Sequence, residues 1–345
     1  MAHITKLSVI VPCYNRLDEL IELFPSLEEQ TLARDKFEII VVDDGSNDGT
    51  EEFVVNYISD SHISFSFYKQ ENKGPGAARN LGLENASGDF FIFVDSDVIV
   101  PSHWLAEVFD KVNEEHLDAY GGPDKAHESF SPLLKAIDYA MTSFITTGGL
   151  RGKKGKKLAK FFPRSFNMGL SKSVYDRIGG FGGLRHGQDI EYSNRIIKSG
   201  ANVGFIENAY VFHKRRTSLK KFFKQAFNWG VARINLYKLD SNMLEPLHCI
   251  PAMATALFLL VLLLTPVSEF NSILTRLMLG SMGFVFCASA IHSVFKYKNI
   301  VTPFYVPFTM FFQIFAYGLG FITAFFKRIV LGGAELKGFS KNYYK

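Results

Sequence analysis

The sequence predicts an α/β protein in which a mostly parallel, doubly wound sheet is followed by C-terminal transmembrane helices. In the first half of the chain, short runs rich in Val, Ile and Phe alternate with helical segments, which is the pattern of strands joined by crossover helices. A polar cluster follows each of these runs. Charged residues are spread through the first two thirds, whereas long apolar runs dominate after about Pro246.

The composition supports a globular part attached to a membrane region. Of the 345 residues, 47% are hydrophobic, and 34 phenylalanines are many for a soluble protein. The N-terminal "LSVIVP" is too short for a secretory signal and charged residues follow it, so we expect the globular part to stay in the cytosol. The widely separated Cys13, Cys249 and Cys287 imply neither a disulfide framework nor a metal knuckle.

The predicted strands and helices place the polar clusters at one edge of the sheet. Strands are expected at 7–12, 37–44, 63–70 and 88–97, and helices around 18–24, 50–58 and 76–86. Strands and helices in alternation favour right-handed crossovers and a parallel sheet. In such sheets ligands bind beyond the carboxyl ends of the strands, which is where every cluster falls.

The segment "FFIFVDSDVIVP" ends a buried strand in two carboxylates, Asp95 and Asp97. Side chains alternate along a strand, so both carboxylates emerge on the same side and repel one another unless a cation lies beside them. Oxygen ligands of this kind suit Mg²⁺ or Mn²⁺, and such an ion can bridge to a diphosphate. Taken alone, the motif is better explained by a solvated turn before the next helix.

Four segments taken together favour the metal site over the solvated turn. They are "VIVPCYNR", "VVDDGSNDGT", "NKGPGAARNLGLENASGDFFIFVDSD" and "GGFGGLRHGQDIEYSNR". In their order and approximate spacing, from about Ser8 to His213, the sequence resembles glycosyltransferase family 2, the inverting enzymes with the GT-A fold. The resemblance implies a nucleotide-sugar donor, expected to be a UDP-sugar, a Mg²⁺ or Mn²⁺ ion, and a single displacement onto an acceptor hydroxyl or phosphate.

The resemblance also assigns the donor site. Its residues are Pro12, Tyr14, Arg16, Asp43, Asp44, Lys73, Gly74, Arg79, Asp95 and Asp97. The first three belong to the nucleotide-contacting segment, and Asp43 or Asp44 accepts a hydrogen bond from the base, although Asp44 also fits an Asx turn. Glycines permit close backbone approach and Arg79 can meet a phosphate, but the Walker GK[ST] ending is absent. By family analogy Asp95 faces the ribose and Asp97 the metal ion.

The acceptor side needs a base, and Asp189 is assigned this role because it matches the second residue of the family's Glu-Asp pair. Gln188 departs from the pair by lacking the charge. A helix-terminal acid stabilised by the macrodipole is the alternative, and it fits Glu191 better. Because a polyprenyl-phosphate acceptor hardly needs a base, Asp189 favours a hydroxyl acceptor.

A basic, aromatic segment follows at residues 214–239. It contains eight Lys or Arg and no acidic residue. Nucleic acid binds such patterns, but the apolar runs downstream favour a helix on anionic membrane lipid, and we expect no nucleic-acid partner. His213 stands where some family members carry a further metal ligand, although a structural histidine is the alternative. "QAFNW" resembles the QxxRW motif of processive members, so Trp229 is assigned to an acceptor site, and Asn228 in place of Arg counts against a processive polymerase.

Three apolar runs, at 250–267, 277–295 and 304–326, are long enough to span or nearly span a bilayer. With the catalytic domain inside, the linker 296–299 falls inside as the positive-inside rule prefers. Three spans would place the basic tail outside, against that rule, so either the third run is re-entrant or the rule is overridden. The basic loop 151–157 is expected to be solvated. We expect a multi-pass protein of the cell inner membrane with a cytoplasmic catalytic domain.

The expected domains are a GT-A domain (1–213), an interfacial helix segment (214–245), a membrane region of two to three helices (246–328) and a basic tail (329–345). The expected activity is metal-dependent, inverting sugar transfer to a lipid-linked or surface-glycan hydroxyl. Glycosylation of a polyprenyl phosphate and a non-catalytic membrane scaffold are the alternatives. A nucleotidyltransferase is disfavoured because "VIVPCYNR" lacks its glycine-rich loop.

Overall fold

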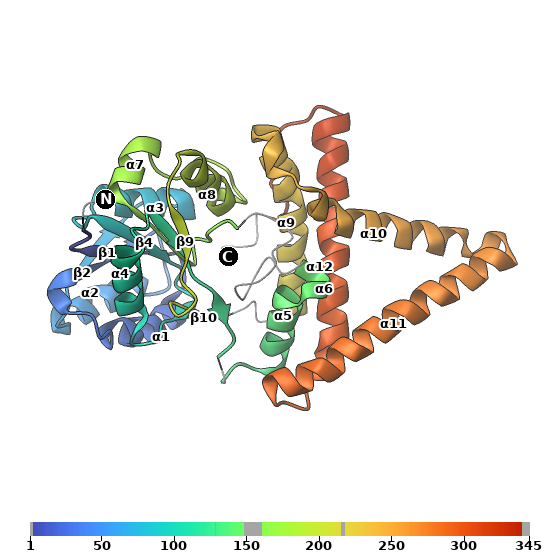
Figure 1. Ribbon diagram of the computed structural model, residues 1–345, viewed down its shortest axis with the longest axis horizontal. Coiled ribbons are helices and arrows are strands. Elements are labelled where there is room, and N and C mark those ends of the chain that lie inside the picture. Colours follow the sequence, from blue (N-terminus) through green and yellow to red (C-terminus); the bar gives the residue numbers. More distant parts are fainter. Residues whose placement is uncertain (1–2, 128, 148–160, 215–217, 340–345) are drawn as a thin grey trace. The chain divides into compact units, whose positions relative to one another are not determined.

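The computed structural model describes residues 3–127, 129–147, 161–214 and 218–339. Within them the chain forms two compact units. The first contains residues 3–127 and 161–214, and the second contains 129–147 and 218–339. Figure 1 shows the strands and covering helices of the first unit and the long helices of the second.

A seven-stranded mixed sheet forms the centre of the first unit, in the order β3-β2-β1-β4-β8-β6-β9. The strands are β1 (Leu7–Cys13), β2 (Phe37–Asp43), β3 (Phe65–Lys69), β4 (Phe90–Val94), β6 (Ala119–Gly121), β8 (Asn167–Ser171) and β9 (Val203–Phe205). The first four are the predicted strands and pair in parallel. Only β8 runs against its neighbours β4 and β6. The predicted, mostly parallel α/β fold is confirmed.

Helices cover both faces of this sheet. On one face lie α1 (Leu17–Glu28), α2 (Thr50–Asp60) and α4 (Trp104–Glu114), and on the other lie α3 (Pro75–Glu84), α7 (Lys172–Ile178) and α8 (Gln188–Lys198). Successive side chains of a strand point to opposite faces of the sheet, so Val9 packs into the core on one face and Ile10 into the core on the other. Burial on both faces explains the continuous apolar runs of β1 and β4.

A second, three-stranded sheet positions part of the candidate site. It is made of β5 (Val98–Ile99), β10 (Val211–His213) and β7 (Asp124–Lys125), in that order. His213 is the register partner of Val98, and the Lys214 N–H donates to the Asp97 carbonyl over 2.8 Å. Segments far apart in the sequence are thereby fixed beside one another.

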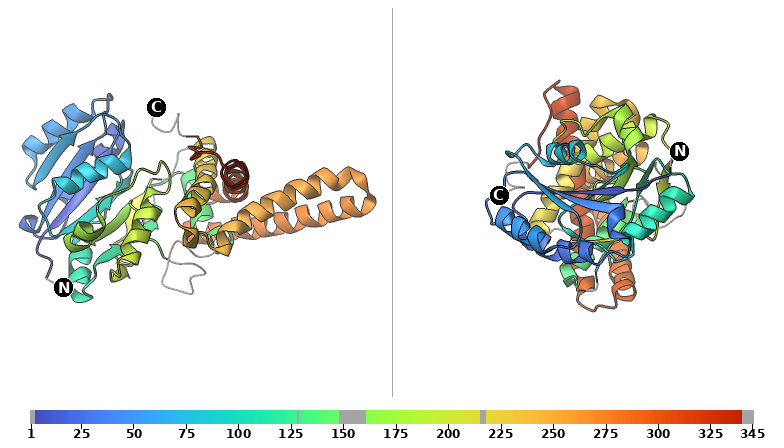
Figure 2. Two further views of the ribbon diagram at one scale, coloured as in Figure 1. Left: turned by 90° about the horizontal axis from the view of Figure 1, so that it is seen from above. Right: turned by 90° about the vertical axis from the view of Figure 1, so that its left-hand side faces the viewer.

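The second unit consists of helices, namely α5 (Pro132–Thr142), α6 (Phe144–Thr147), α9 (Leu219–Leu239), α10 (Pro246–Leu264), α11 (Glu269–Tyr297) and α12 (Thr302–Ala324). In the described residues three segments are long and apolar enough to cross a membrane: Pro246–Val267, Glu269–Tyr297 and Thr302–Val330. They contain the three predicted runs. Figures 1 and 2 show α9 and α12 side by side and α10 and α11 as a hairpin that extends away from them.

Residues 129–147, which come between β7 and β8 in the sequence, belong to the second unit. Helix α5 packs on α12, where the Thr309 hydroxyl donates to the Ala136 carbonyl over 3.0 Å. The Tyr297 hydroxyl of α11 donates to the Asp138 carboxylate over 2.5 Å. The sequence of the first unit is therefore interrupted by a helix that packs with the membrane-type helices. The basic loop 151–157 lies outside the described residues.

Candidate active site

The parallel strands bring most predicted donor-site residues to one edge of the sheet. Pro12 is the last residue but one of strand β1 and is the register partner of Val42 in β2. The next residue, Cys13, is the register partner of Asp43. Tyr14 and Arg16 follow this strand directly. The Arg16 guanidinium lies 2.9 Å from the carboxylate of Glu19, one turn into α1.

Asp43 and Asp44 have different partners. Asp43 is fully buried and accepts the Ser46 N–H over 2.9 Å. Asp44 accepts the backbone N–H groups of Lys73 and Gly74, each over 2.8 Å. Asp44 therefore shapes the loop before α3 through partners distant in the sequence rather than through a local Asx turn. Its contact with a nucleotide base stays a prediction. Gly74 has φ +93°, a conformation that favours glycine.

Burial, and next the charge of Asp43, raise the pKa of the nearby Cys13 thiol. This shift disfavours the thiolate, the form in which a cysteine acts as a nucleophile.

Arg79 and Asp95 form an ion pair at the end of β4. The guanidinium Nη2 and the carboxylate Oδ1 are 2.6 Å apart, and Arg79 is buried while Asp95 is partly exposed. The guanidinium also lies 5.4 Å from the ring centroid of Phe181. This pair fixes the orientation of Asp95, and it gives Arg79 a carboxylate as partner rather than leaving it wholly available to a phosphate.

Asp97 and His213 meet through the small sheet. The His213 Nε2 atom lies 3.1 Å from Asp97 Oδ1, and its Nδ1 atom lies 3.7 Å from Asp124 Oδ2. All three side chains are largely buried. The imidazole is thus flanked by a carboxylate on each side, in the manner of a metal-ligating histidine that a carboxylate behind it orients.

A divalent ion fits beside Asp97 and His213. Carboxylate oxygen and imidazole nitrogen are both ligands that Mn²⁺ accepts. The two ring nitrogens of His213 point to different carboxylates, so an ion at Nε2 is out of reach of Asp124. In agreement, no group of three His, Cys, Asp or Glu side chains surrounds one metal position in the part of the chain that the structure describes. Such an ion needs further oxygen ligands from a phosphate or from water.

Asp189, the predicted base, lies in the first turn of α8 beside Arg164. The Arg164 Nη1 atom donates to Asp189 Oδ2 over 3.1 Å. Burial alone would raise the pKa of the Asp189 carboxyl, but the charge and hydrogen bond of Arg164, with the charge of Arg79, hold this pKa below its ordinary value. Asp189 is therefore ionised at neutral pH and able to accept a proton.

Gln188 packs against the start of α3. A Cβ atom on Gly76 would come within 2.7 Å of the Gln188 side-chain amide, so a larger residue there would displace this amide. Beside it, a Cβ on Gly74 would lie 3.8 Å from the Arg185 guanidinium. The start of α8, which carries Asp189, and the loop predicted to hold the donor phosphates are therefore adjacent.

Three charged residues of this edge were not found from the sequence: Arg164, Asp124 and Arg185. Asp124 follows a strand of only three residues, β6, which gives no apolar run to recognise. Arg164 lies in a loop whose composition carries no pattern, whereas Arg185 lies within the quoted segment "GGFGGLRHGQDIEYSNR" but was assigned no role. The rule that polar residues after strands form the site would have found Asp124 if that short strand had been predicted.

Trp229 lies in the second unit, on α9. Its ring is 6.4 Å from that of Phe222, edge to face, and it packs against an apolar cluster that includes Val306 and Met310 of α12. The neighbouring Asn228 accepts the backbone N–H of Phe339 over 3.0 Å. Asn228, where the motif has Arg, thus binds the C-terminal tail, and the acceptor role of Trp229 stays a prediction.

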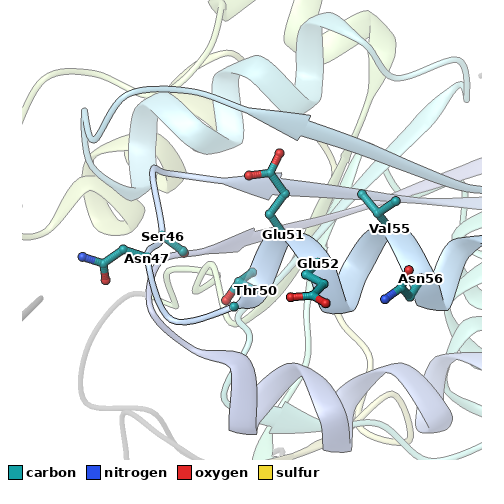
Figure 3. Close-up of a pocket in the computed structure, with 8 residues that line it drawn as sticks. Ser46, Asn47, Thr50, Glu51, Glu52, Val55 and Asn56 are labelled. Carbon is teal, nitrogen blue, oxygen red and sulfur yellow. The ribbon is translucent and has the colours of Figure 1, made fainter.

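A hollow of about 520 Å³ lies at the start of α2 (Figure 3). It is lined by Ser46, Asn47, Gly49, Thr50, Glu51, Glu52, Val55 and Asn56. None of these residues is among the predicted site residues, and two exposed glutamates repel an anionic donor. We assign no chemistry to it.

Comparison with known proteins places this geometry in a family. The model of glycosyl transferase family 2 matches residues 8–179. Glycosyltransferase AglE of Haloferax volcanii is 26% identical over 256 residues, covering 74% of this chain and 80% of that protein. Poly(ribitol-phosphate) beta-N-acetylglucosaminyltransferase TarS of Staphylococcus aureus is 38% identical over 113 residues, covering 33% of this chain but only 20% of that protein.

Mannosyltransferase PcManGT from Pyrobaculum calidifontis, solved in complex with GDP-Man and Mn²⁺, has a TM-score of 0.62 at 17% identity, covering 90% of this chain and 87% of that chain. This likeness shows the fold. Together with the family match it defines the class of protein: the chain is a glycosyltransferase with a GT-A fold. More narrowly, it belongs to glycosyltransferase family 2, as the sequence motifs predicted.

Proposed function

We propose that the chain is a metal-dependent, inverting glycosyltransferase that moves a sugar from a nucleotide-sugar, a UDP-sugar in the first instance, to a hydroxyl of a lipid-linked or surface glycan. It works at the cytosolic face of the cell inner membrane. The observation that carries the proposal is the meeting of Asp97 with His213 at the same sheet edge as the Arg79–Asp95 ion pair. The complex of PcManGT with GDP-Man and Mn²⁺ supports a nucleotide-sugar donor and a divalent ion.

The chain's own residues supply the remaining chemistry. Asp97 and His213 hold the ion, which when bound offsets the negative charge that develops on the departing diphosphate. Asp95, held by Arg79, accepts hydrogen bonds from the ribose. The donor phosphates lie against the glycine loop that includes Gly74.

Asp189 acts as the base for the acceptor. It takes the proton of the acceptor hydroxyl while that oxygen attacks the anomeric carbon, and the bond from this carbon to the diphosphate oxygen breaks on the opposite face. The configuration is therefore inverted. The ionised state of Asp189, maintained by Arg164, favours a hydroxyl acceptor, because a polyprenyl phosphate is already anionic and needs no base.

The experiment is a donor panel. The purified full chain in detergent or nanodiscs is incubated with UDP- and GDP-sugars and with Mn²⁺ or Mg²⁺, and mass spectrometry detects nucleoside diphosphate release and product. We expect release from one donor only, abolished by EDTA and restored by Mn²⁺ or Mg²⁺. Release from no donor with either ion would favour the non-catalytic scaffold. A monoglycosyl phospholipid product would favour polyprenyl-phosphate transfer.

A further inference from the structure

Helix α12 has the length and composition of a membrane span, but the helix beside it does not. In sequence, α12 has no charged residue from Thr302 to Ala324. Its neighbour α9 has five basic residues and no acidic one: Lys220, Lys221, Lys224, Arg233 and Lys238. The two helices cannot occupy different environments if they are packed together.

They are packed together, in parallel, over most of their length. The Phe223 ring, near the start of α9, lies 5.7 Å from the Phe312 ring, in the middle of α12. In the middle of α9, a Cβ on Gly230 would collide with the backbone of Tyr317, so the two main chains touch. Beyond the end of α12, the Arg328 guanidinium donates to the Asn235 amide oxygen over 2.7 Å. Figures 1 and 2 show the two helices next to one another.

If α12 crossed the bilayer, α9 would cross with it. The 21 residues of α9 extend about 32 Å, which is close to the thickness of the hydrocarbon core. Lys224 and Arg233 would then lie at the depth of the hydrocarbon core, and the partly exposed Lys224 would cost about 2.5–3.5 kcal/mol there. Arg233 is only 8% exposed, so its guanidinium cannot extend to the membrane surface.

The α10–α11 hairpin has the opposite character. Large apolar side chains are exposed along it, among them Leu263 (73%), Leu277 (66%) and Phe284 (75%). Of the apolar windows of α10 and α11 only 22% and 11% are buried, against 44% for α12. Residues 277–295 carry no charge and extend about 28 Å, enough to cross the hydrocarbon core.

We propose that, among the described helices, only the α10–α11 hairpin crosses the bilayer, and that α12 lies with α9 and α5 in the headgroup region of the face from which α10 enters. Exposed aromatic side chains of α12, such as Phe304 and Phe308, contact the acyl chains, and exposed lysines of α9 contact lipid phosphates. This inference does not depend on the donor or the acceptor.

The arrangement resolves the conflict with the positive-inside rule. A hairpin crosses the membrane twice and returns the chain to the side from which it entered. The tail after α12, with Lys327, Arg328 and Lys337, is then on the same side as the basic α9, as the rule prefers.

The test uses single cysteines in the full chain, with Cys249→Ser and Cys287→Ser as background and the buried Cys13 retained. Ser268→Cys reports the tip of the hairpin, Lys337→Cys the tail and Ser59→Cys the exposed end of α2. Sealed vesicles are treated with a membrane-impermeant maleimide before or after permeabilisation. We expect Lys337→Cys and Ser59→Cys to label from one side and Ser268→Cys from the other. Labelling of Lys337→Cys together with Ser268→Cys, or of all three from one side, overturns the proposal.

Depth measurements provide an independent readout. Spin labels are placed on α12 at Phe304 and Phe315, just beyond its end at Phe326, and on α11 at Leu277, Phe284 and Ile291, in separate single-cysteine variants. Oxygen and a water-soluble nickel chelate then report the depth of each label. We expect similar, shallow depths along α12 and a passage through the bilayer centre along α11. A passage through the centre along α12 overturns the proposal, even if a tail variant fails to insert.

Discussion

The Nε2 atom of His213 lies 3.1 Å from the Asp97 carboxylate, although the two residues are far apart in the sequence. The small sheet of β5, β10 and β7 causes this proximity, because it pairs the residue after Asp97 with the end of β10. The same sheet places Asp124 on the other side of the imidazole. We expect Asp97, His213 and Asp124 together to determine the affinity for a divalent metal ion.

The first prediction concerns the two metal ligands. Asp97→Asn and His213→Ala should each abolish transfer, since each removes a ligand of the ion that offsets the charge on the diphosphate. Binding of Mn²⁺, measured by electron paramagnetic resonance in the presence of a nucleoside diphosphate, should weaken at least tenfold. Asp110→Asn, at an exposed position of α4, is the matched control and should change neither quantity. Full Mn²⁺ affinity in both site variants would falsify the assignment.

The second prediction concerns Asp124. Removal of a carboxylate behind a metal-ligating histidine typically costs 10- to 100-fold in metal affinity. We therefore expect Asp124→Asn to weaken Mn²⁺ binding by about this factor while leaving nucleotide binding without metal unchanged. Asp124→Glu should recover part of the affinity. An Asp124→Asn protein with normal Mn²⁺ affinity and a lowered melting temperature would mean that Asp124 only stabilises the small sheet.

The sheet and its polar edge could be predicted because their signals are local. Apolar runs followed by polar clusters identify β1 to β4, and the period of two places Asp95 and Asp97 on one side. The partners of these carboxylates could not be predicted in the same way. Arg164 reaches Asp189 only after the chain has folded, and the short strand before Asp124 leaves no pattern in the sequence.

For the membrane-type helices, too, the sequence predicts the elements but not their tertiary contacts. Length and hydropathy identify three candidate spans, but they do not report that α12 packs against the basic α9. Helix α5 has an apolar face, yet nothing local assigns this face to α12 rather than to the catalytic sheet. Such assignments depend on tertiary contacts between distant segments, for example the hydrogen bond from Thr309 to Ala136.

The third prediction is the loss of the base. Asp189→Asn preserves the shape of the side chain and removes its ability to take a proton, so kcat should fall by about 10²- to 10⁴-fold. Donor affinity, measured by calorimetry with the nucleoside diphosphate, should stay within a factor of two to three of the wild type. Asp176→Asn, an exposed acid on α7, controls for the change from carboxylate to amide. An equal loss of donor affinity would place Asp189 in the donor site instead.

The fourth prediction is a shift in pH dependence. The charge and hydrogen bond of Arg164 lower the pKa of Asp189, whereas burial raises it. A base works only when ionised, so the acid limb of kcat/KM in the wild type should lie below the ordinary range of a carboxyl group. Arg164→Met removes the lowering contributions of Arg164 and leaves those of burial, Arg79 and the Ile190 N–H, so the limb should move to higher pH. An unchanged pH profile at reduced kcat would show that Arg164 acts in some other way than on the ionisation of Asp189.

The last prediction concerns anionic lipid at α9. Each Lys near an anionic surface contributes about 1 kcal/mol, so the exposed Lys220 and Lys221 together should hold the start of α9 at the headgroups by roughly 2 kcal/mol. A fragment that ends at Leu239 is unsuitable, because it would uncover Phe222 and Ile234, which are buried in the full chain. The full chain is therefore compared in nanodiscs of neutral and of anionic lipid, with hydrogen exchange of α9 as the measurement.

We expect slower exchange at the start of α9 in anionic nanodiscs, and we expect the difference to fade as salt screens the attraction. In the double variant Lys220→Glu and Lys221→Glu, exchange should no longer slow with anionic lipid, while nucleotide affinity stays normal because the donor site lies in the first unit. Lys172→Glu with Lys198→Glu makes the same change of charge at exposed positions of the first unit and should keep the lipid effect. Equal exchange of wild-type α9 in both kinds of nanodisc at low salt would instead mean that these lysines serve another anion, such as the diphosphate of a lipid-linked acceptor.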